Sequence, residues 1–167
     1  MERVSIAMLK ELMMDKAQMI DKLNEVLKWE YAGLIQYTQF SFLVQDTWRE
    51  VFSKFFRDNG EEALEHAHLV GDKIVALGGV TTVERGEVKQ STELQEMLEY
   101  SLEVESKQVE LYTQALELCG PRDVALRVLL EDLCRQEQEG VDHLEKLLKK
   151  RELAITGSRT SQGQKAG

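Results

Sequence analysis

The stretch NGEEALEHAHLVGDKIVALGG, residues 59–79, sets two of the chain's three histidines among glutamates. Steps of three and four residues place one set of its side chains on a single helix face. This set is Ala63, His66, Val70, Ile74 and Leu77. The two glycines that follow are typical of a helix end. A histidine therefore stands in the middle of an apolar stripe, and its role depends on the partners that the rest of the chain supplies.

The composition is that of one ordinary globular domain. The chain has 167 residues, of which 43% are hydrophobic and 31% are charged, and this suits a single domain with its own core. Pro121 is the only proline, so long uninterrupted helices are expected. The two cysteines form no CxxC motif and do not indicate a disulfide scaffold.

The charge and hydropathy of the chain exclude several classes of partner. A formal net charge of −9 argues against broad binding to nucleic acid or to anionic membranes, and it suits the attraction of cations. No apolar run reaches the length of a membrane span, and the N-terminus lacks a continuous apolar leader. We therefore predict a cytoplasmic protein.

Signals for helix starts and helix ends predict four long helices, over about residues 15–45, 47–77, 92–118 and 121–153. Thr47 with Glu50, and Thr92 with Gln95, have the spacing of capping boxes at the second and third helix starts. A glycine followed by Pro121 predicts that the fourth helix begins directly after the third one ends.

The lengths of the connections predict the topology. The first and second helices, and likewise the third and fourth, are joined by tight turns, so each pair is antiparallel. The connection between the pairs has about a dozen residues, which is enough to cross from one end of a bundle to the other. We predict an all-α four-helix bundle over residues 15–153, with residues 1–14 as an N-terminal extension that has some helical character. The small, polar residues 154–167 are expected to be a disordered tail.

Each predicted helix carries a glutamate or a histidine in the middle of its apolar stripe. These residues are Glu30, His66, Glu105 and Glu137, with Glu62 one turn before His66. They lie roughly 15 to 19 residues from the two tight turns, or about 25 Å at the rise of an α-helix. All four helices therefore offer a candidate ligand at one level of the bundle.

Several ionised carboxylates in a dry core are very costly unless something compensates their charge. The stripes offer no lysine or arginine near this level, whereas a pair of bound cations would compensate the glutamates. Two metal ions held by glutamate and histidine are a known core arrangement in helix bundles. Carboxylate and imidazole ligands suit iron or manganese, and also zinc.

A simpler interpretation of the same residues stays open. A single glutamate in a stripe often buries its stem and keeps its carboxylate in water, and His66 could be a hydrogen-bonded core histidine. His68 points about 200° away from His66 on an ideal helix and is expected at the surface. Tyr37 and Tyr112 fit core residues whose hydroxyls find partners. Tyr37 could instead hold a metal-bound carboxylate, and it is the candidate catalytic residue.

Four segments resemble, in order and spacing, the four helix motifs of the ferritin-like superfamily, and of bacterioferritins most closely. They are LNEVLKWEYAGLIQY, EHAHLVGDKIVALGG, LQEMLEYSLEVE and EQEGVDHLEKL, within about residues 20–150. The resemblance implies a di-iron site with four matching ligands, which are Glu30, His66, Glu105 and Glu137.

Two positions depart from the family's pattern of Glu-x-x-His on the second and fourth helices. The glutamate position of the second helix is Ala63, and the histidine position of the fourth helix is Gly140. Glu-x-x-x-His pairs lie nearby, and their i, i+4 spacing also shares a helix face. Either Glu62 and His143 rebuild the site, or one metal position is weak or empty. The full set of candidate ligands is Glu30, Glu62, His66, Glu105, Glu137 and His143.

Further expectations follow from the resemblance. The haem-binding methionine of bacterioferritins falls at Leu64, so no haem is expected. The short C-terminal helix of the large shells is hard to find in the glycine-rich tail, which leaves a smaller shell or a dimer as the expected homo-oligomer.

The resemblance implies a non-haem protein with two iron ions that oxidises Fe(II) with O2 or H2O2, as a ferroxidase-type oxidoreductase, and stores or detoxifies iron. A di-iron enzyme that reduces peroxide or acts as an oxygenase, without storage, is an alternative. A structural or interaction bundle with a decayed metal site is another. Binding to nucleic acid or to a membrane is not expected.

Overall fold

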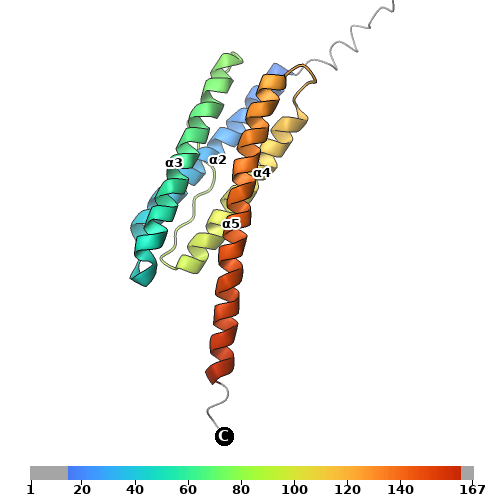
Figure 1. The fold of residues 1–167 in the computed structure, drawn as a ribbon. Coiled ribbons are helices and arrows are strands. Elements are labelled where there is room, and N and C mark those ends of the chain that lie inside the picture. The colour runs from blue at the N-terminus through green and yellow to red at the C-terminus, as the bar shows by residue number, and fades with distance from the viewer. Residues whose placement is uncertain (1–14, 163–167) are drawn as a thin grey trace, which may run out of the picture.

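Four long helices make up the part of the chain that the computed structural model describes, which is residues 15–162, with side chains described to residue 149. They are α2 (Lys16–Leu43), α3 (Arg49–Ala76), α4 (Leu94–Glu117) and α5 (Val124–Gln162), and a short 3-10 helix, η1 (Asp46–Trp48), precedes α3. Residues 15–162 contain no strand, and the helices run side by side (Figure 1). The predicted extension over residues 1–14 lies outside the described range.

The first helix begins where the sequence offers a cap. The Asp15 carboxylate accepts hydrogen bonds from the backbone N–H groups of Ala17, at 2.9 Å, and Gln18, at 3.3 Å. These bonds satisfy N–H groups that have no partner within the helix. Both ends of α2 lie within two residues of the bounds expected from the sequence.

The starts of α3 and α4 differ from the prediction. The chain enters α3 through η1, and Trp48 at the N-cap makes no side-chain hydrogen bond, so the predicted capping box at Thr47 is wrong. At α4 the N-cap residue is Glu93, also without a side-chain cap. The Ser91 hydroxyl accepts a hydrogen bond from the backbone N–H of Glu93 at 2.9 Å. Ser91 therefore takes the local role that was predicted for Thr92.

The bounds of α5 also differ from those expected. The helix begins at Val124 rather than at Pro121, because Gly120 and Asp123 close a turn between α4 and α5. The Gly120 N–H donates to the Asp123 carboxylate, and the Asp123 N–H donates to the Gly120 carbonyl, both at 3.1 Å. At its other end α5 continues to Gln162 and includes part of the segment expected to be disordered. Small polar residues weaken a helix by well under about 1 kcal/mol each, so composition alone does not mark its end.

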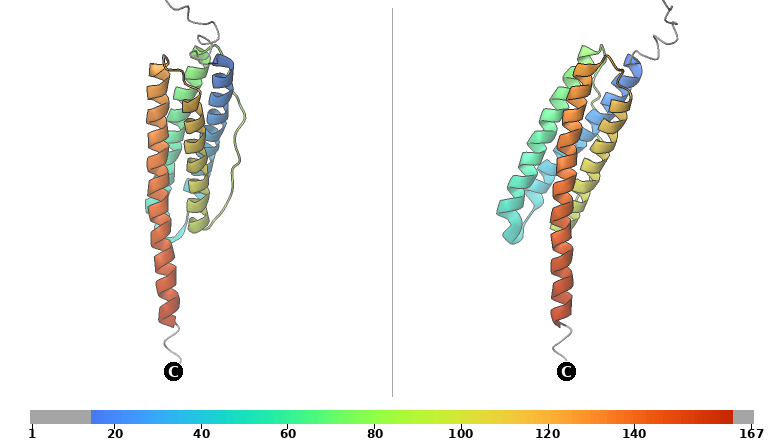
Figure 2. Two further views of the ribbon diagram at one scale, coloured as in Figure 1. Left: turned by 90° about the vertical axis from the view of Figure 1, so that its right-hand side faces the viewer. Right: turned by 45° about the vertical axis from the view of Figure 1, so that its right-hand side comes forward.

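The topology is the predicted one. In Figure 1, α2 and α3 are antiparallel, as are α4 and α5, and tight turns join the members of each pair. The connection from α3 to α4, residues 77–93, runs along the outside of the bundle from one end to the other (Figure 2). The all-α four-helix bundle, with two antiparallel pairs joined by a long crossover, is confirmed.

Side chains of α2 hold the crossover against the bundle. The buried side-chain amide of Gln36 makes two hydrogen bonds to Lys89, accepting from its N–H at 2.7 Å and donating to its carbonyl. Nearer the start of α2, the Asn24 side chain accepts from the Thr82 N–H at 2.7 Å. The backbone N–H of Gly86 donates to a carbonyl of α2 at 2.8 Å. The crossover therefore has a specific path.

The core consists of two apolar clusters with a polar layer between them. The cluster near the α4–α5 turn includes Leu23, Leu27, Ile74, Leu111 and Leu130. The cluster near the α2–α3 turn includes Phe40, Phe56, Met97, Leu98 and Leu144. Buried glutamates and His66 lie along the helices between these two sets. The apolar clusters thus exclude water from both sides of the polar layer, whose level in the bundle was predicted from the sequence.

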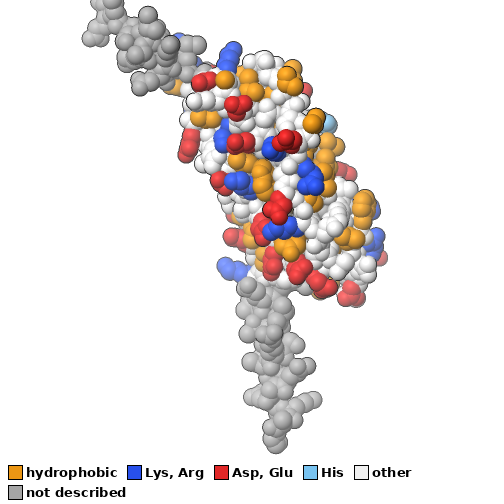
Figure 3. Space-filling model, turned by 180° about the vertical axis from the view of Figure 1, so that it is seen from behind, with side chains coloured by type: hydrophobic (Ala, Val, Ile, Leu, Met, Phe, Trp, Pro, Cys, Tyr) orange, Lys and Arg blue, Asp and Glu red, His pale blue; other side chains and the backbone are white. Residues whose placement is uncertain are grey.

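Charged side chains of both signs cover the face of the bundle that carries the crossover. In Figure 3, acidic, basic and apolar groups are interspersed over most of this face, and acidic groups gather along its lower edge. Ion pairs account for part of this pattern, including Lys28 with Glu84, Lys89 with Glu103 and Lys107 with Glu110. No helix within residues 15–162 is long and apolar enough to cross a membrane.

Candidate metal centre

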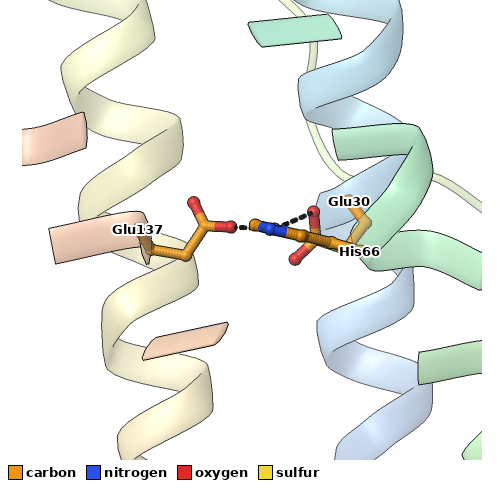
Figure 4. A group of neighbouring side chains, drawn as sticks. All are labelled: Glu30, His66 and Glu137. Atoms are coloured by element: carbon orange, nitrogen blue, oxygen red, sulfur yellow. Dashed lines mark hydrogen bonds and ion pairs between the residues drawn. The ribbon is translucent and has the colours of Figure 1, made fainter. Parts of the chain in front are cut away.

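Three helices bring two glutamates and a histidine together in the polar layer (Figure 4). Glu30 comes from α2, His66 from α3 and Glu137 from α5. One ligand atom from each residue lies within 4.8 Å of the other two. The side chains are almost fully buried, with 0%, 2% and 4% of their residue surfaces exposed.

His66 is the centre of this group. Its Nδ1 lies 2.6 Å from a carboxylate oxygen of Glu137 and 3.8 Å from one of Glu30. Its Nε2 faces the edge of the bundle, 3.4 Å from the amide oxygen of Gln136 and 3.9 Å from a carboxylate oxygen of Glu62. Nδ1 is therefore the nitrogen that converges with the two buried carboxylates.

Two side chains of α4 orient Glu30. Gln108 Nε2 donates a hydrogen bond to one carboxylate oxygen at 2.8 Å, and the Tyr112 hydroxyl donates to the other at 2.6 Å. Sequence analysis missed the role of Gln108 and took Tyr112 only as a core residue. A signal was present, since both follow Glu105 on the same stripe of α4.

Glu105 lies beside this group and turns toward α5. Its carboxyl group accepts a hydrogen bond from the Tyr37 hydroxyl and is hydrogen-bonded to Glu137. It also occupies the space next to Gly140. A Cβ atom at residue 140 would lie 2.9 Å from Glu105 Cδ, and closer still to its carboxyl oxygen. The absence of a side chain at Gly140 is thus what makes room for Glu105.

Burial raises the pKa of every carboxyl group in the layer. The pKa of Glu30 is held well above its ordinary value by burial and then by the charge of Glu137. The pKa of Glu137 is raised well above its ordinary value by burial and by Glu105. Burial raises the pKa of Glu105 to about 7, although the hydrogen bond from Tyr37 opposes this rise. Burial and an adjacent carboxylate likewise raise the pKa of the hydroxyl groups of Tyr37 and Tyr112.

No lysine or arginine within the described part of the chain forms an ion pair with these carboxylates. The ion-pair partner of Glu30 and Glu137 is the imidazole of His66. Two carboxylate oxygens and an imidazole nitrogen are donors that suit divalent iron, manganese or zinc. The buried residues therefore fit a divalent cation, which would supply the missing positive charge.

The remaining candidate ligands lie outside the group. Half of the Glu62 side chain is exposed, at 48%, and its carboxylate reaches only the outer nitrogen of His66. His143 is exposed on α5, where the centre of its ring lies 5.7 Å from that of Phe55 and the two rings are tilted by 37°. Ala63 is buried and supplies no ligand. Of the two Glu-x-x-x-His pairs, only His66 contributes to the buried group, and neither Glu62 nor His143 joins it.

Comparisons with known proteins agree with this fold and layer. The model of the ferritin-like domain family matches residues 20–154. A comparison with curated proteins finds no match.

Solved structures similar to the chain include a ferritin-like, diiron-carboxylate protein from Bacillus anthracis str. Ames. It is 32% identical over 80% of this chain and 97% of its own, with a TM-score of 0.77. A bacterioferritin from Rhodobacter capsulatus, with a metal-free dinuclear site and haem iron, is 26% identical over 84% and 89%, with a TM-score of 0.75.

A dodecameric thioferritin from Bacteroides fragilis, described as bacterioferritin-related, shares the fold. It is 19% identical over 86% of this chain and 92% of its own, with a TM-score of 0.79. The match to the family model, the identity to the Bacillus protein and the buried carboxylate layer all agree. The chain therefore belongs to the ferritin-like family.

Proposed function

We propose that this protein binds Fe(II) at Glu30, His66 and Glu137, oxidises it with O2 or H2O2, and stores or detoxifies the Fe(III) produced. The observation that carries the proposal is a buried set of carboxylate and imidazole donors, from three helices, without a lysine or arginine partner in the described part of the chain. Manganese or zinc would suit the same donors. The proposal places the activity in the cytoplasm, and no role for haem is included.

The electron balance of this reaction is simple. Each Fe(II) gives up one electron. One H2O2 takes up two electrons and two protons to form two water molecules, so two Fe(II) are consumed for each H2O2. One O2 takes up four electrons and four protons to form two water molecules, so four Fe(II) are consumed for each O2. Glu105 can hold a proton near neutral pH, since its pKa is about 7, and the Tyr37 hydroxyl hydrogen-bonds to it. We assign these two residues to positioning and proton transfer at the carboxylate layer. The acidic chain, with a net charge of −9, would favour the approach of Fe(II).

Oxidation of Fe(II) by purified protein tests this proposal. Metal-free protein is mixed with Fe(II) under anaerobic conditions, O2 or H2O2 is added, and Fe(III) is followed by its absorbance. Glu30→Ala and Glu137→Ala should slow oxidation by at least about tenfold, since loss of a ligand weakens a metal site at least as much as loss of a supporting residue. Glu131→Gln, which changes an exposed glutamate of α5, should leave the rate unchanged. Equal rates in all four proteins would refute the proposal.

A metal-free interaction bundle is the second candidate, and Ala63 and Gly140 are the observation that favours it, because the family's pattern has ligands at both positions. The two candidates differ in how the folded state responds to metal. A native site raises the midpoint of thermal unfolding when Fe(II) or Zn(II) is added, by mass action on the folded state. A decayed site leaves that midpoint where it was.

We also propose that the protein forms a homo-oligomer. Exposed apolar side chains lie at and near the α2–α3 end of the bundle, including Phe42, Trp48 and Val51. Phe42 and Leu64 line a shallow groove of about 170 Å³ between α2 and α3. An oligomer would cover such a surface and could enclose stored iron.

A further inference from the structure

We infer that each chain holds one metal ion, at Glu30, His66 and Glu137, and that the carboxyl group of Glu105 fills the neighbouring position instead of binding a second ion. This inference concerns the same centre as the proposed function. It changes the number of ions implied by the resemblance, from two per chain to one.

The space beside Gly140 is occupied by the carboxyl group of Glu105. A Cβ atom at residue 140 would approach Glu105 Cδ to 2.9 Å, so the end of the Glu105 side chain would have to shift before a histidine could fit there. Glu105 is held in this position by the Tyr37 hydroxyl on one side and by Glu137 on the other. Its carboxyl group therefore replaces, in space, the ligand that Gly140 lacks.

The number of side chains that can donate to a metal also favours a single ion. Metal sites with imidazole and carboxylate ligands commonly use three or four protein donors. Glu30, His66 and Glu137 supply three within 4.8 Å of one another, and they are the only such group among the described residues. A second ion would have Glu105 and a shared oxygen of Glu137. Ala63 offers no donor, and His143 is exposed beside Phe55.

The balance between the charge of the ions and that of the buried carboxylates favours a single ion as well. One divalent ion neutralises the carboxylates of Glu30 and Glu137 if His66 binds as a neutral imidazole. A second divalent ion would find Glu105 as the one further buried carboxyl group of the layer, so two ions would carry one positive charge more than the three carboxylates. Glu62, the next carboxylate, is half exposed and faces the outer nitrogen of His66. The donor set and the charge therefore agree on one ion.

Zn(II) binding to metal-free protein tests the inference without any redox chemistry. Bound zinc per chain is measured by equilibrium dialysis with elemental analysis, and the double variant Glu30→Gln/Glu137→Gln gives the background from surface carboxylates. Wild-type protein should bind one zinc ion per chain above this background. Glu105→Gln should still bind one, because Glu105 is not a ligand. Two ions in the wild type, or loss of the single ion in Glu105→Gln, would overturn the inference.

A gain of a second ion completes the test. Ala63→Glu/Gly140→His restores both missing ligands, and it should bind two zinc ions per chain. Ala63→Gln/Gly140→Phe has side chains of similar shape with no metal-binding imidazole or carboxylate, and it should remain at one or lose the ion. If the restored variant fails to fold, the wild-type and Glu105→Gln values decide the matter.

The failure of this inference is distinguishable from the failure of the proposed function. Two zinc ions per wild-type chain would refute the single-ion site and leave Fe(II) oxidation intact. One zinc ion without any oxidation of Fe(II) would refute the proposed activity alone. Absence of zinc above background would refute the single-ion site, and the Fe(II) oxidation assay would still decide the proposed activity.

Discussion

At the scale of single residues, Glu105 makes the stability of the metal-free protein depend on pH. Burial raises its pKa from an ordinary 4.5 to about 7. Between these two values the folded state binds more protons than the unfolded state, so the free energy of unfolding falls as pH rises. A shift of this size corresponds to an effect on the order of 3 kcal/mol. Glu30 and Glu137 act in the same direction, because their pKa values are raised as well.

We predict that metal-free wild-type protein, kept in a chelator, is more stable at pH 5 than at pH 8, and that Glu105→Gln reduces this difference. The amide keeps the shape of the carboxyl group and carries no charge, so the cost of ionising it disappears. Urea unfolding at several pH values measures the effect. Glu131→Gln is the control, since Glu131 is exposed. A dependence on pH that is as steep in Glu105→Gln as in the wild type would contradict the prediction.

Tyr112 supports a ligand without binding metal itself. Its hydroxyl donates a 2.6 Å hydrogen bond to Glu30, and both groups are buried. Loss of a residue that orients a ligand weakens metal affinity by about 10- to 100-fold. We predict such a loss of Zn(II) affinity in Tyr112→Phe, with one ion still bound at saturation. Competition with a chromophoric chelator measures the affinity. Tyr31→Phe, a partly buried tyrosine of α2 that packs against the apolar cluster, should have wild-type affinity.

At the scale of helices and connections, Gln36 couples the crossover to α2. It is 1% exposed and makes both of its hydrogen bonds to the backbone of Lys89. We predict that Gln36→Ala lowers the free energy of unfolding by about 2 kcal/mol, because two hydrogen bonds to the partly buried Lys89 backbone, each worth about 1 kcal/mol, are lost. Amide hydrogen exchange at Lys89 should become faster, while exchange in the middle of the helices changes little.

A matched change elsewhere on the same hairpin checks this prediction. Gln45 is exposed and makes no capping bond at the start of η1. Gln45→Ala should alter neither the stability nor the exchange at Lys89. Equal exchange at Lys89 in both variants would mean that the rest of the crossover holds its path without Gln36.

Helical periodicity predicted the elements and the level of the site, because side chains three and four residues apart share a face wherever the helix ends. Helix ends were less predictable. The start of α5 depends on a turn closed by Asp123, and the start of α4 depends on Ser91. Such local hydrogen bonds can start a helix at any of two or three neighbouring residues, and helical periodicity does not distinguish among these positions.

The orientation of Glu105 was also beyond sequence reasoning. Its position in the stripe predicted that it is buried, and it is 6% exposed. Its direction depends on the empty space at Gly140, on a different helix, and on Tyr37. A contact between α2, α4 and α5 has no counterpart in the pattern of any one helix.

At the scale of the whole molecule, the surface of α2 and α3 is the part that remains to be covered. Phe42 is 64% exposed and lines the groove between these helices together with Leu64, which is 40% exposed. Burial of apolar side chains like these contributes about 25 cal/mol per Å². A second copy of the chain is the occupant we propose, as in the homo-oligomer proposed above, because a contact between copies would remove these apolar side chains from water.

We predict that Phe42→Glu shifts the protein to a smaller assembly, because a carboxylate cannot be buried in an apolar contact without a partner. Val128→Glu adds the same charge on α5, at a valine that is 57% exposed, and should leave the assembly unchanged. Light scattering coupled to size-exclusion chromatography measures the mass of each protein at matched concentrations. An unchanged mass in Phe42→Glu, or an equal loss in both variants, would show that this groove is not the contact between copies. Since Phe42 lies in the α2–α3 groove, outside the metal-binding group, Phe42→Glu should still bind one zinc ion per chain, which would separate assembly from metal binding.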